Sequence, residues 1–287
     1  MKTDRTRWHG WDAVRCVAGD CELLVGVSTG PRILSLRRGD GDNVLYRDTT
    51  DFGVGDWRLY GGHRFTVAPE EDRSYVPDNA RCGVEVADGE LRVAAPAGPD
   101  GTRRHLVIRA AEDGAGFDLR HVLVNGGREP WQGALWAITC VPHAAQVVAP
   151  RGPTPLRFWP GIEAVAWQLA PGYVALTPNR ARGKIGWYSQ AGWLASLQRE
   201  ATLVIHSPDI PPEADCVDGG CNVELFTCSD YVELETLGGR VTLPPGGHTE
   251  HRQRWRLLAP GYTPRDWPAI AAQAGCAAAP TAPASSP

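Results

Sequence analysis

Two short runs late in the chain alternate apolar and polar residues with a period of two. They are Asn222–Thr227 and Tyr231–Leu237, and a polar tripeptide separates them. Such alternation is typical of a half-buried β-strand, and a short polar break between two strands is typical of a turn. In the first run, Glu224 falls on the face opposite Val223 and Leu225. The sequence therefore predicts a hairpin that carries Glu224 in the middle of a strand.

Glu224 has two interpretations at this stage. A strand holds a carboxylate more rigidly than a loop does, which suits a general base. Spacing alone favours the other interpretation, in which Glu224 points into solvent from a half-buried sheet, because exposed acids are common on strands.

Similar short segments, bounded by turn-forming residues, recur along the chain. They are Cys21–Val27, Arg32–Leu36, Val44–Tyr46, Gly83–Val86, Glu90–Ala94, Arg104–Ala110, Gly116–Val124, Ala134–Val141, Gly172–Leu176, Lys184–Tyr188, Gly192–Gln198, Thr202–His206, Arg240–Leu243 and Thr249–Leu258. The 33 glycines and 24 prolines also indicate many turns and few long helices. We expect an all-β fold, a large antiparallel β-sandwich formed by residues 1–265 as one domain.

The two ends of the chain lack this pattern. Residues 1–12 form a polar lead, and residues 266–287 are rich in alanine and proline. We expect a short helix at Pro268–Ala274 and disorder beyond Gly275.

Charge and composition exclude several classes of partner. The net charge of −4 provides no basic field for nucleic acid, and no apolar run approaches the ~20 residues of a membrane helix. The first residues lack the apolar stretch of a secretory signal, so we expect a cytoplasmic protein without disulfides. The pairs Cys16/Cys21 and Cys216/Cys221 have a C-x4-C spacing that is unusual for zinc. No metal or cofactor is therefore expected.

Residues 48–80 show little periodicity but are dense in aromatic and charged side chains. Long segments without secondary structure are usually functional or disordered, and the aromatic content disfavours disorder. Aromatic faces stack on the C–H face of a sugar, and charged groups bind its hydroxyls. This segment is therefore predicted to be an ordered, sugar-binding loop.

The order of motifs along residues 10–258 resembles the galactose-mutarotase-like superfamily (aldose 1-epimerase-like proteins), and within it a bacterial domain-of-unknown-function branch. The segments that carry the resemblance are Gly30–Ile33, Tyr60–Arg64, Ala68–Glu70, Tyr75–Asn79, His121 with Asn125, Ala134–Ala137, Lys184–Gly186, Gly192-Trp193, Asp218–Glu224, Leu234–Gly238, Pro245-Gly246 and Arg254-Trp255. The resemblance implies an antiparallel supersandwich whose sheet face binds a sugar. It also implies a late glutamate that deprotonates the anomeric hydroxyl and a histidine that protonates the ring oxygen.

The resemblance makes Glu224 the expected base. Trp136 lies near the position of the acid and can stack but cannot donate a proton as an acid–base group. His63 is then the expected acid, with Lys184 second. The expected substrate-binding residues are Arg64, Glu70, Asp78, Asn79, Trp57, Trp136, Trp193 and Asn222.

Three functions follow from this resemblance. The first is a mutarotase-like isomerase or epimerase with a carboxylate base in a tryptophan-lined cleft. The second is a non-catalytic carbohydrate-binding protein that has lost the acid. The third is a lyase or biosynthetic tailoring enzyme on the same scaffold, with Arg64 or Lys184 neutralising a carboxylate. In each case the expected partner is a sugar or sugar-like small molecule.

Overall fold

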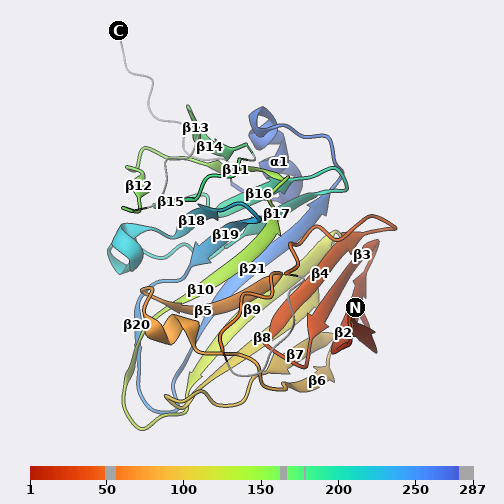
Figure 1. The fold of residues 1–287 in the computed structure, drawn as a ribbon, viewed down its shortest axis with the longest axis vertical. Coiled ribbons are helices and arrows are strands. Elements are labelled where there is room, and N and C mark those ends of the chain that lie inside the picture. The colour runs from red at the N-terminus through yellow and green to blue at the C-terminus, as the bar shows by residue number, and fades with distance from the viewer. Residues whose placement is uncertain (49–55, 162–166, 178, 278–287) are drawn as a thin grey trace.

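Two large antiparallel sheets form the fold (Figure 1). The structure is a computed structural model and describes residues 1–48, 56–161, 167–177 and 179–277. Within these ranges the first sheet has eleven strands, in the order β1-β2-β3-β4-β5-β10-β19-β18-β15-β12, with β20 paired to β10. Its strands are β1 (Lys2–Trp8), β2 (Trp11–Ala18), β3 (Cys21–Gly26), β4 (Arg32–Arg38), β5 (His63–Ala68), β10 (Trp131–Pro142), β12 (Arg157–Phe158), β15 (Gly183–Trp187), β18 (Val223–Thr227), β19 (Tyr231–Leu237) and β20 (Val241–Leu243).

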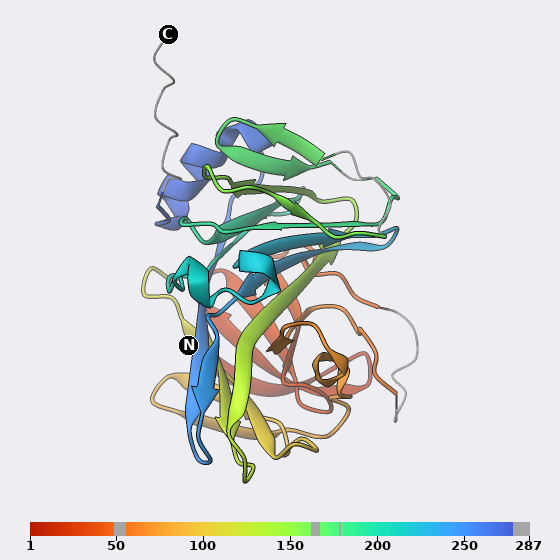
Figure 2. The same ribbon diagram turned by 90° about the vertical axis from the view of Figure 1, so that its left-hand side faces the viewer.

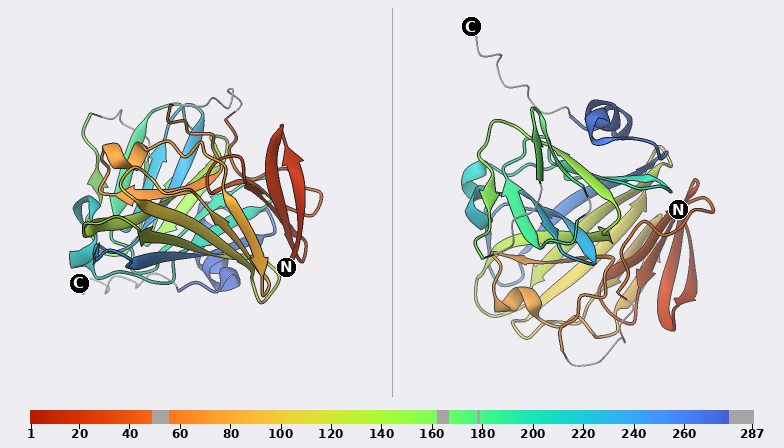
Figure 3. Two further views of the ribbon diagram at one scale, coloured as in Figure 1. Left: turned by 90° about the horizontal axis from the view of Figure 1, so that it is seen from below. Right: turned by 45° about the horizontal axis from the view of Figure 1, so that its top comes forward.

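The second sheet has ten strands in the same described ranges, in the order β13-β14-β11-β16-β17-β21-β9-β8-β7-β6. They are β6 (Gly83–Ala87), β7 (Glu90–Ala94), β8 (Thr102–Ala110), β9 (Gly116–Asn125), β11 (Gln146–Pro150), β13 (Trp167–Ala170), β14 (Tyr173–Leu176), β16 (Trp193–Leu197), β17 (Thr202–His206) and β21 (His248–Leu258). The long strands β10 and β21 cross the molecule diagonally in Figure 1, and the N-terminal strands stand at one edge in Figure 3.

The main hydrophobic core lies between the two sheets. Leu23, Ile33, Leu225 and Leu234 from the first sheet pack in one cluster with Leu106, Ile108, Leu203 and Trp255 from the second. Burial of these apolar faces against each other is what holds two sheets together as a sandwich. The predicted all-β antiparallel sandwich is confirmed.

Helical structure in the described ranges is confined to short elements. They are α1 (Trp267–Ala274) and the 3₁₀ turns η1 (Asp72–Tyr75), η2 (Glu213–Asp215), η3 (Asp218–Gly220) and η4 (Pro264–Asp266). Helix α1 packs on the outer face of the second sheet through Ile270 and Ala271, near the β13–β14 hairpin (Figure 2). None of these helices has the length and apolar character needed to cross a lipid bilayer. The predicted disordered tail lies mostly outside the described residues, and the single-domain boundary at residue 265 stays a prediction.

Three local predictions were wrong. The expected polar lead contains strand β1 and the start of β2, which pair from Lys2↔Val17 to Trp8↔Trp11. Val44–Tyr46 is not a strand. The long segment 48–80, partly outside the described residues, contains β5 and η1 rather than one continuous loop. Strand β5 escaped detection because its polar–apolar alternation covers only Arg64–Val67, within a long segment that otherwise shows no period.

Strands β5, β10, β19, β18 and β15 are consecutive neighbours in the first sheet. Successive side chains on a strand point to opposite faces. One face of these five strands therefore belongs to the sandwich core, and the other points away from the second sheet. That outer face carries the candidate site.

Candidate active site on the outer face of the first sheet

The ammonium group of Lys184 on β15 lies between two carboxylates of neighbouring strands. Its Nζ is 2.7 Å from Glu224 Oε2 on β18 and 3.0 Å from Glu235 Oε2 on β19. The lysine side chain is 5% exposed and both glutamate side chains are 0% exposed. Because water does not screen a charge cluster this deeply buried, each of its members depends on the others to keep its charge.

The strand register explains how the cluster forms. Glu224 pairs directly with Glu235 across β18 and β19, and with Gly186 across β18 and β15. Two like charges directly opposite each other on a sheet repel. Lys184 precedes Gly186 by two residues, so its side chain leaves the same face and reaches both carboxylates.

Gly186 provides the space that the Glu224 side chain occupies. A Cβ at this glycine would lie 3.0 Å from Glu224 Cγ, 3.0 Å from Cys221 Sγ and 3.1 Å from the Trp159 ring. These separations are tighter than nearly all real contacts of a Cβ atom. The absence of a side chain at position 186 therefore lets the carboxylate and the indole approach the same point of the sheet.

Two indoles enclose the ammonium group. Lys184 Nζ lies 4.5 Å from the ring centroid of Trp136 and 5.1 Å from that of Trp159. Trp136 Nε1 also donates a hydrogen bond of 2.8 Å to Glu235 Oε2. Cation–π attraction and this hydrogen bond hold the lysine and Glu235 in position, so Trp136 acts on the charge cluster as well as offering a ring face.

Burial shifts the pKa values of these groups. Burial raises the pKa of Glu224, with Lys184 opposing the rise and the negative charges of Glu235 and Asp218 adding to it. Burial would lower the pKa of Lys184, but Glu235 and Glu224 outweigh it and raise that pKa. On the same face, burial and then Glu235 raise the pKa of Glu233 to about 8. The site thus combines a permanent cation with carboxyl groups that hold protons more tightly than usual.

Several buried polar atoms around the cluster have no well-aligned hydrogen-bond partner within the described part of the chain. They are both carboxylate oxygens of Glu224, Oε1 of Glu235, Oδ2 of Asp218, Nε of Arg64 and Nε1 of Trp57. Buried polar atoms in native proteins are nearly always paired. Four of these six atoms are carboxylate oxygens, which accept hydrogen bonds, so their chemistry suits a ligand that carries several hydroxyl donors.

Arg64 and Trp57 form a second part of the same face. Arg64 lies on β5 opposite Ile138 of β10, and its guanidinium stacks 5.1 Å from the Trp57 ring centroid. Tyr75 packs edge-on against Trp57 and donates a hydrogen bond to the exposed Glu70. Burial, and then the charge of Arg32, lower the pKa of the Arg64 guanidinium. The two parts together present cations, carboxylates and aromatic rings on one surface.

His63, the predicted acid, does not lie on this face. It is the neighbour of Arg64 in β5, so its side chain points to the opposite side of the sheet, into the sandwich. There Nε2 of His63 lies 2.7 Å from Nε2 of His121, and Nδ1 lies 2.9 Å from Thr139 Oγ1. The prediction that His63 acts with Glu224 is corrected, because the sheet itself separates the two side chains. His121 is a buried core residue, as the sequence indicated.

Two other predicted binding residues lie elsewhere for packing reasons. Trp193 is buried on the outer face of the second sheet under α1, and its Nε1 donates to the carbonyl of Ala277. Asn222 uses its side-chain amide to bridge the backbone N–H and C=O of Ser189. Both side chains have structural roles in the fold, which corrects their assignment as cleft residues.

Asp78 and Asn79 are also committed to contacts within the protein. Asp78 forms a 2.8 Å ion pair with the buried Arg32, and Asn79 accepts a 2.6 Å hydrogen bond from the Tyr60 hydroxyl. They hold the 76–80 segment against the body of the protein. Of the predicted site residues, the structure thus brings together Glu224, Lys184 and Trp136, with Arg64, Trp57 and Glu70 alongside.

Sequence reasoning missed four residues of the cluster, namely Glu233, Glu235, Asp218 and Trp159. The signal for the two glutamates was present, because they follow the same two-residue period in Tyr231–Leu237 that placed Glu224 on its face. Asp218 and Trp159 come from turns whose position only the folded chain reveals. No group of three or more metal-binding side chains that could hold an ion is present in the described ranges.

No protein-family model matches the chain, and no curated protein matches it by sequence. Its fold is similar to that of several solved structures. A putative aldose 1-epimerase from Escherichia coli K12 has a TM-score of 0.58 at 13% identity, over 85% of this chain and 98% of that one. A galactose mutarotase-like protein from Lactobacillus casei has a TM-score of 0.58 at 9% identity, over 85% and 99% of the two chains.

A third similar structure belongs to a larger protein. It is a TPR-domain containing protein from Parabacteroides distasonis, with a TM-score of 0.62 at 12% identity over 89% of this chain. The chain spans about half of that protein, 48% of its length. At these identities the comparisons establish the fold.

Proposed function

Because the chain has the fold of galactose-mutarotase-like proteins, we propose that its outer-face site binds a sugar or sugar-like molecule and catalyses an isomerase reaction of the mutarotase type. The observation that carries the proposal is the set of buried carboxylate oxygens without a well-aligned hydrogen bond beside Lys184 and two indoles. Sugar hydroxyls supply the donors that such oxygens lack, and the C–H face of a pyranose packs on an indole.

Glu224 is the proposed base. Its raised pKa makes its carboxylate a stronger proton acceptor than an ordinary glutamate, and its strand position keeps the carboxyl group in place. In the proposed reaction, Glu224 removes the proton of the anomeric hydroxyl while the bond between the anomeric carbon and the ring oxygen breaks. Rotation of the open aldehyde and reclosure, with Glu224 returning its proton to the carbonyl oxygen, then give the other anomer.

Lys184 replaces His63 as the proposed partner of the base. Its raised pKa keeps it as an ammonium that donates a hydrogen bond to the ring oxygen. As the carbon–oxygen bond breaks, this oxygen becomes an alkoxide, which is more basic than an amine. Lys184 can therefore transfer a proton to it and recover that proton on reclosure.

A second candidate function is carbohydrate binding without turnover. It is favoured by the position of Lys184, which is already engaged by two carboxylates. In that case the ammonium balances charge and orients hydroxyls, and the site performs no proton transfer.

Anomer-exchange NMR on the purified full chain separates these functions. Freshly dissolved α-aldoses and uronic acids are mixed with wild-type protein, Glu224→Gln, Lys184→Met and the control Glu85→Gln, which alters an exposed acid on β6. We expect the wild type and the control to accelerate α-to-β equilibration and the two site variants to lose most of the acceleration.

The remaining outcomes are also informative. Line broadening of a sugar without acceleration, abolished in Glu224→Gln, would support the binding function. Acceleration that survives in Glu224→Gln would refute the assignment of the base. Absence of both effects across the panel would count against a simple sugar as the ligand.

A further inference from the structure

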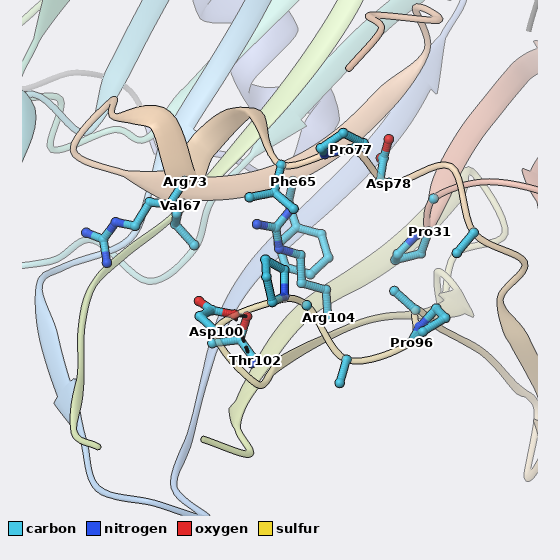
Figure 4. Close-up of a pocket in the computed structure, with 17 residues that line it drawn as sticks. Pro31, Phe65, Val67, Arg73, Pro77, Asp78, Pro96, Asp100, Thr102 and Arg104 are labelled. Atoms are coloured by element: carbon cyan, nitrogen blue, oxygen red, sulfur yellow. Dashed lines mark hydrogen bonds between the residues drawn. The ribbon is translucent and has the colours of Figure 1, made fainter. Parts of the chain in front are cut away.

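A cavity lies on the opposite side of β5 from the outer-face site, at one end of the sandwich. It has a volume of about 150 Å³ and is bounded by β5, the start of β8 and two loops, 76–80 and 95–100 (Figure 4). Phe65 and Val67 line it from β5, whereas their neighbours Arg64 and Thr66 point to the opposite face. The cavity and the outer-face site are therefore back to back and share no side chain of this strand.

Arg104 projects into this cavity from an unusual position. It has the same parity on β8 as the core residues Leu106 and Ile108, so its side chain points toward the first sheet, and it is half-buried. Figure 4 shows its side chain passing the 95–100 loop toward Phe65. An inward-facing charge on a core strand is costly unless something pairs with it.

No hydrogen bond or ion pair engages the Arg104 guanidinium within the described ranges. Two carboxylates line the cavity with it. Asp78 Oδ2 pairs with Arg32, while Asp78 Oδ1 has no hydrogen-bond partner among the described residues, and Asp100 Oδ1 accepts hydrogen bonds from the backbone N–H and hydroxyl of Thr102. Burial lowers the pKa of Arg104 and the positive charge of Arg64 lowers it further, while the charges of Asp78 and Asp100 partly oppose this shift. The guanidinium is thus a partly desolvated cation with free donors.

The rest of the cavity lining is mixed, with an apolar part and a polar part. Four prolines, Phe65 and small aliphatic side chains form its apolar part, and Arg73, Asp78, Asp100 and Thr102 form its polar part. Proline rings are rigid, so a ligand that packs on them orders few side chains on binding. A volume of about 150 Å³ is close to that of a protein cavity that accepts benzene.

We propose that this cavity binds a small organic carboxylate with a compact apolar body, of the size of benzoate. The guanidinium of Arg104 receives the carboxylate in a bidentate pair, the arrangement for which an arginine fork is suited. The prolines and Phe65 enclose the apolar part. The assignment does not depend on the function of the outer-face site.

Ligand-observed NMR titration with benzoate tests the proposal, with benzamide as the neutral ligand of equal size. Four full-length proteins are compared, namely wild type, Arg104→Met, Arg103→Met and Ala97→Phe. Arg103 is the exposed neighbour of Arg104 on β8 and serves as the matched control. Ala97→Phe adds a ring at the cavity wall without changing the charge, which keeps the test valid if Arg104→Met folds poorly.

We expect saturable benzoate binding to wild type and to Arg103→Met, weakened about tenfold or more in Arg104→Met and lost in Ala97→Phe. Benzamide should bind at least about tenfold more weakly than benzoate, because it lacks the charge. Glu224→Gln should bind benzoate as the wild type does, which separates this site from the outer face. Absence of saturable benzoate binding to the wild type, or equal binding in Arg104→Met and Arg103→Met, would overturn the proposal.

Discussion

Glu224 and Glu235 lie directly opposite each other on neighbouring strands, and the ammonium group of Lys184 contacts both carboxylates. The arrangement is costly, since all three side chains are buried and each carboxylate keeps at least one oxygen without a well-aligned donor among the described residues. This cluster is the centre of the proposed sugar-binding site. The energetic consequences can be measured one residue at a time.

Removal of the Lys184 ammonium group should destabilise the folded protein. Lys184→Met leaves two buried carboxylates facing each other, and we expect a loss of about 3–5 kcal/mol in the free energy of unfolding. The double variant Lys184→Met/Glu235→Gln should recover part of that loss. Urea unfolding measures both, with Lys2→Met, at an exposed lysine, as the control. A single variant as stable as the wild type would show that the cluster carries no net charge interaction.

Glu233 should make the protein less stable as the pH rises. Burial and the charge of Glu235 raise its pKa to about 8 in the folded state, whereas an unfolded chain releases this proton near pH ~4.3. The folded state therefore binds more protons between these values, and its stability falls with increasing pH. We expect Glu233→Gln to lack this part of the decrease in urea unfolding from about pH 5 to about pH 8. The control Glu85→Gln should show the same dependence of unfolding free energy on pH as the wild type. If Glu233→Gln also runs parallel to the wild type, the raised pKa of Glu233 is contradicted.

Gly186→Ala should disturb the site by steric contact, without any change of charge. Its new methyl group would press on Glu224, Cys221 and Trp159, and overpacking of this kind costs about 1–3 kcal/mol. The matched control is Gly238→Ala, where the nearest atom to an added Cβ is 3.6 Å away. Chemical unfolding and the anomer-exchange assay should show losses for the first variant and little change for the second. Equal behaviour of the two variants would mean that the space at Gly186 is dispensable.

The interior histidines should be neutral and hold opposite tautomers. Nδ1 of His121 donates to the carbonyl of His251, so Nε2 of His121 accepts a hydrogen bond from Nε2 of His63. Burial lowers the pKa of His121 to about 4 and that of His251 to about 3, and it lowers the pKa of His63 as well.

The unfolded chain takes up these protons near pH ~6.5, so the stability contributed by the neutral rings is lost as the pH falls below that value. Long-range ¹H–¹⁵N NMR at about pH 6 should show His63 protonated at Nε2 and His121 protonated at Nδ1. A charged ring at that pH would disprove the assignment.

The sequence predicted much of the fold because alternation survives where one face of a strand is more polar than the other. Glu224, with Val223 and Leu225 opposite, is the clearest case, because Val223 and Leu225 lie in the core and Glu224 lies on the other face. The interpretation that Glu224 points into solvent was wrong, since its side chain is buried. The signal is too short in β5, where both faces are buried and polar and apolar residues alternate only over Arg64–Val67. It fails also in β1, whose polar residues at the edge of the sheet resemble an unstructured lead.

The division of residues between the two faces explains the errors at the site. His63 and Arg64 are adjacent in sequence, and only their membership of a strand places one in the core and the other beside Trp57. Trp193 and Trp136 are indistinguishable as residue types, but α1 covers the first and the second lies beside Lys184.

The sequence by itself determined the fold class, the hairpin that carries Glu224 and the polar side of that hairpin, because period-two patterns are local properties of the chain. Only the tertiary structure decided the partners of Glu224, because Lys184, Glu235 and Trp136 come from three other strands whose order and register depend on the whole sheet. The same holds for Arg104, because the cavity that its side chain enters is formed by β5 and two loops that are distant in sequence.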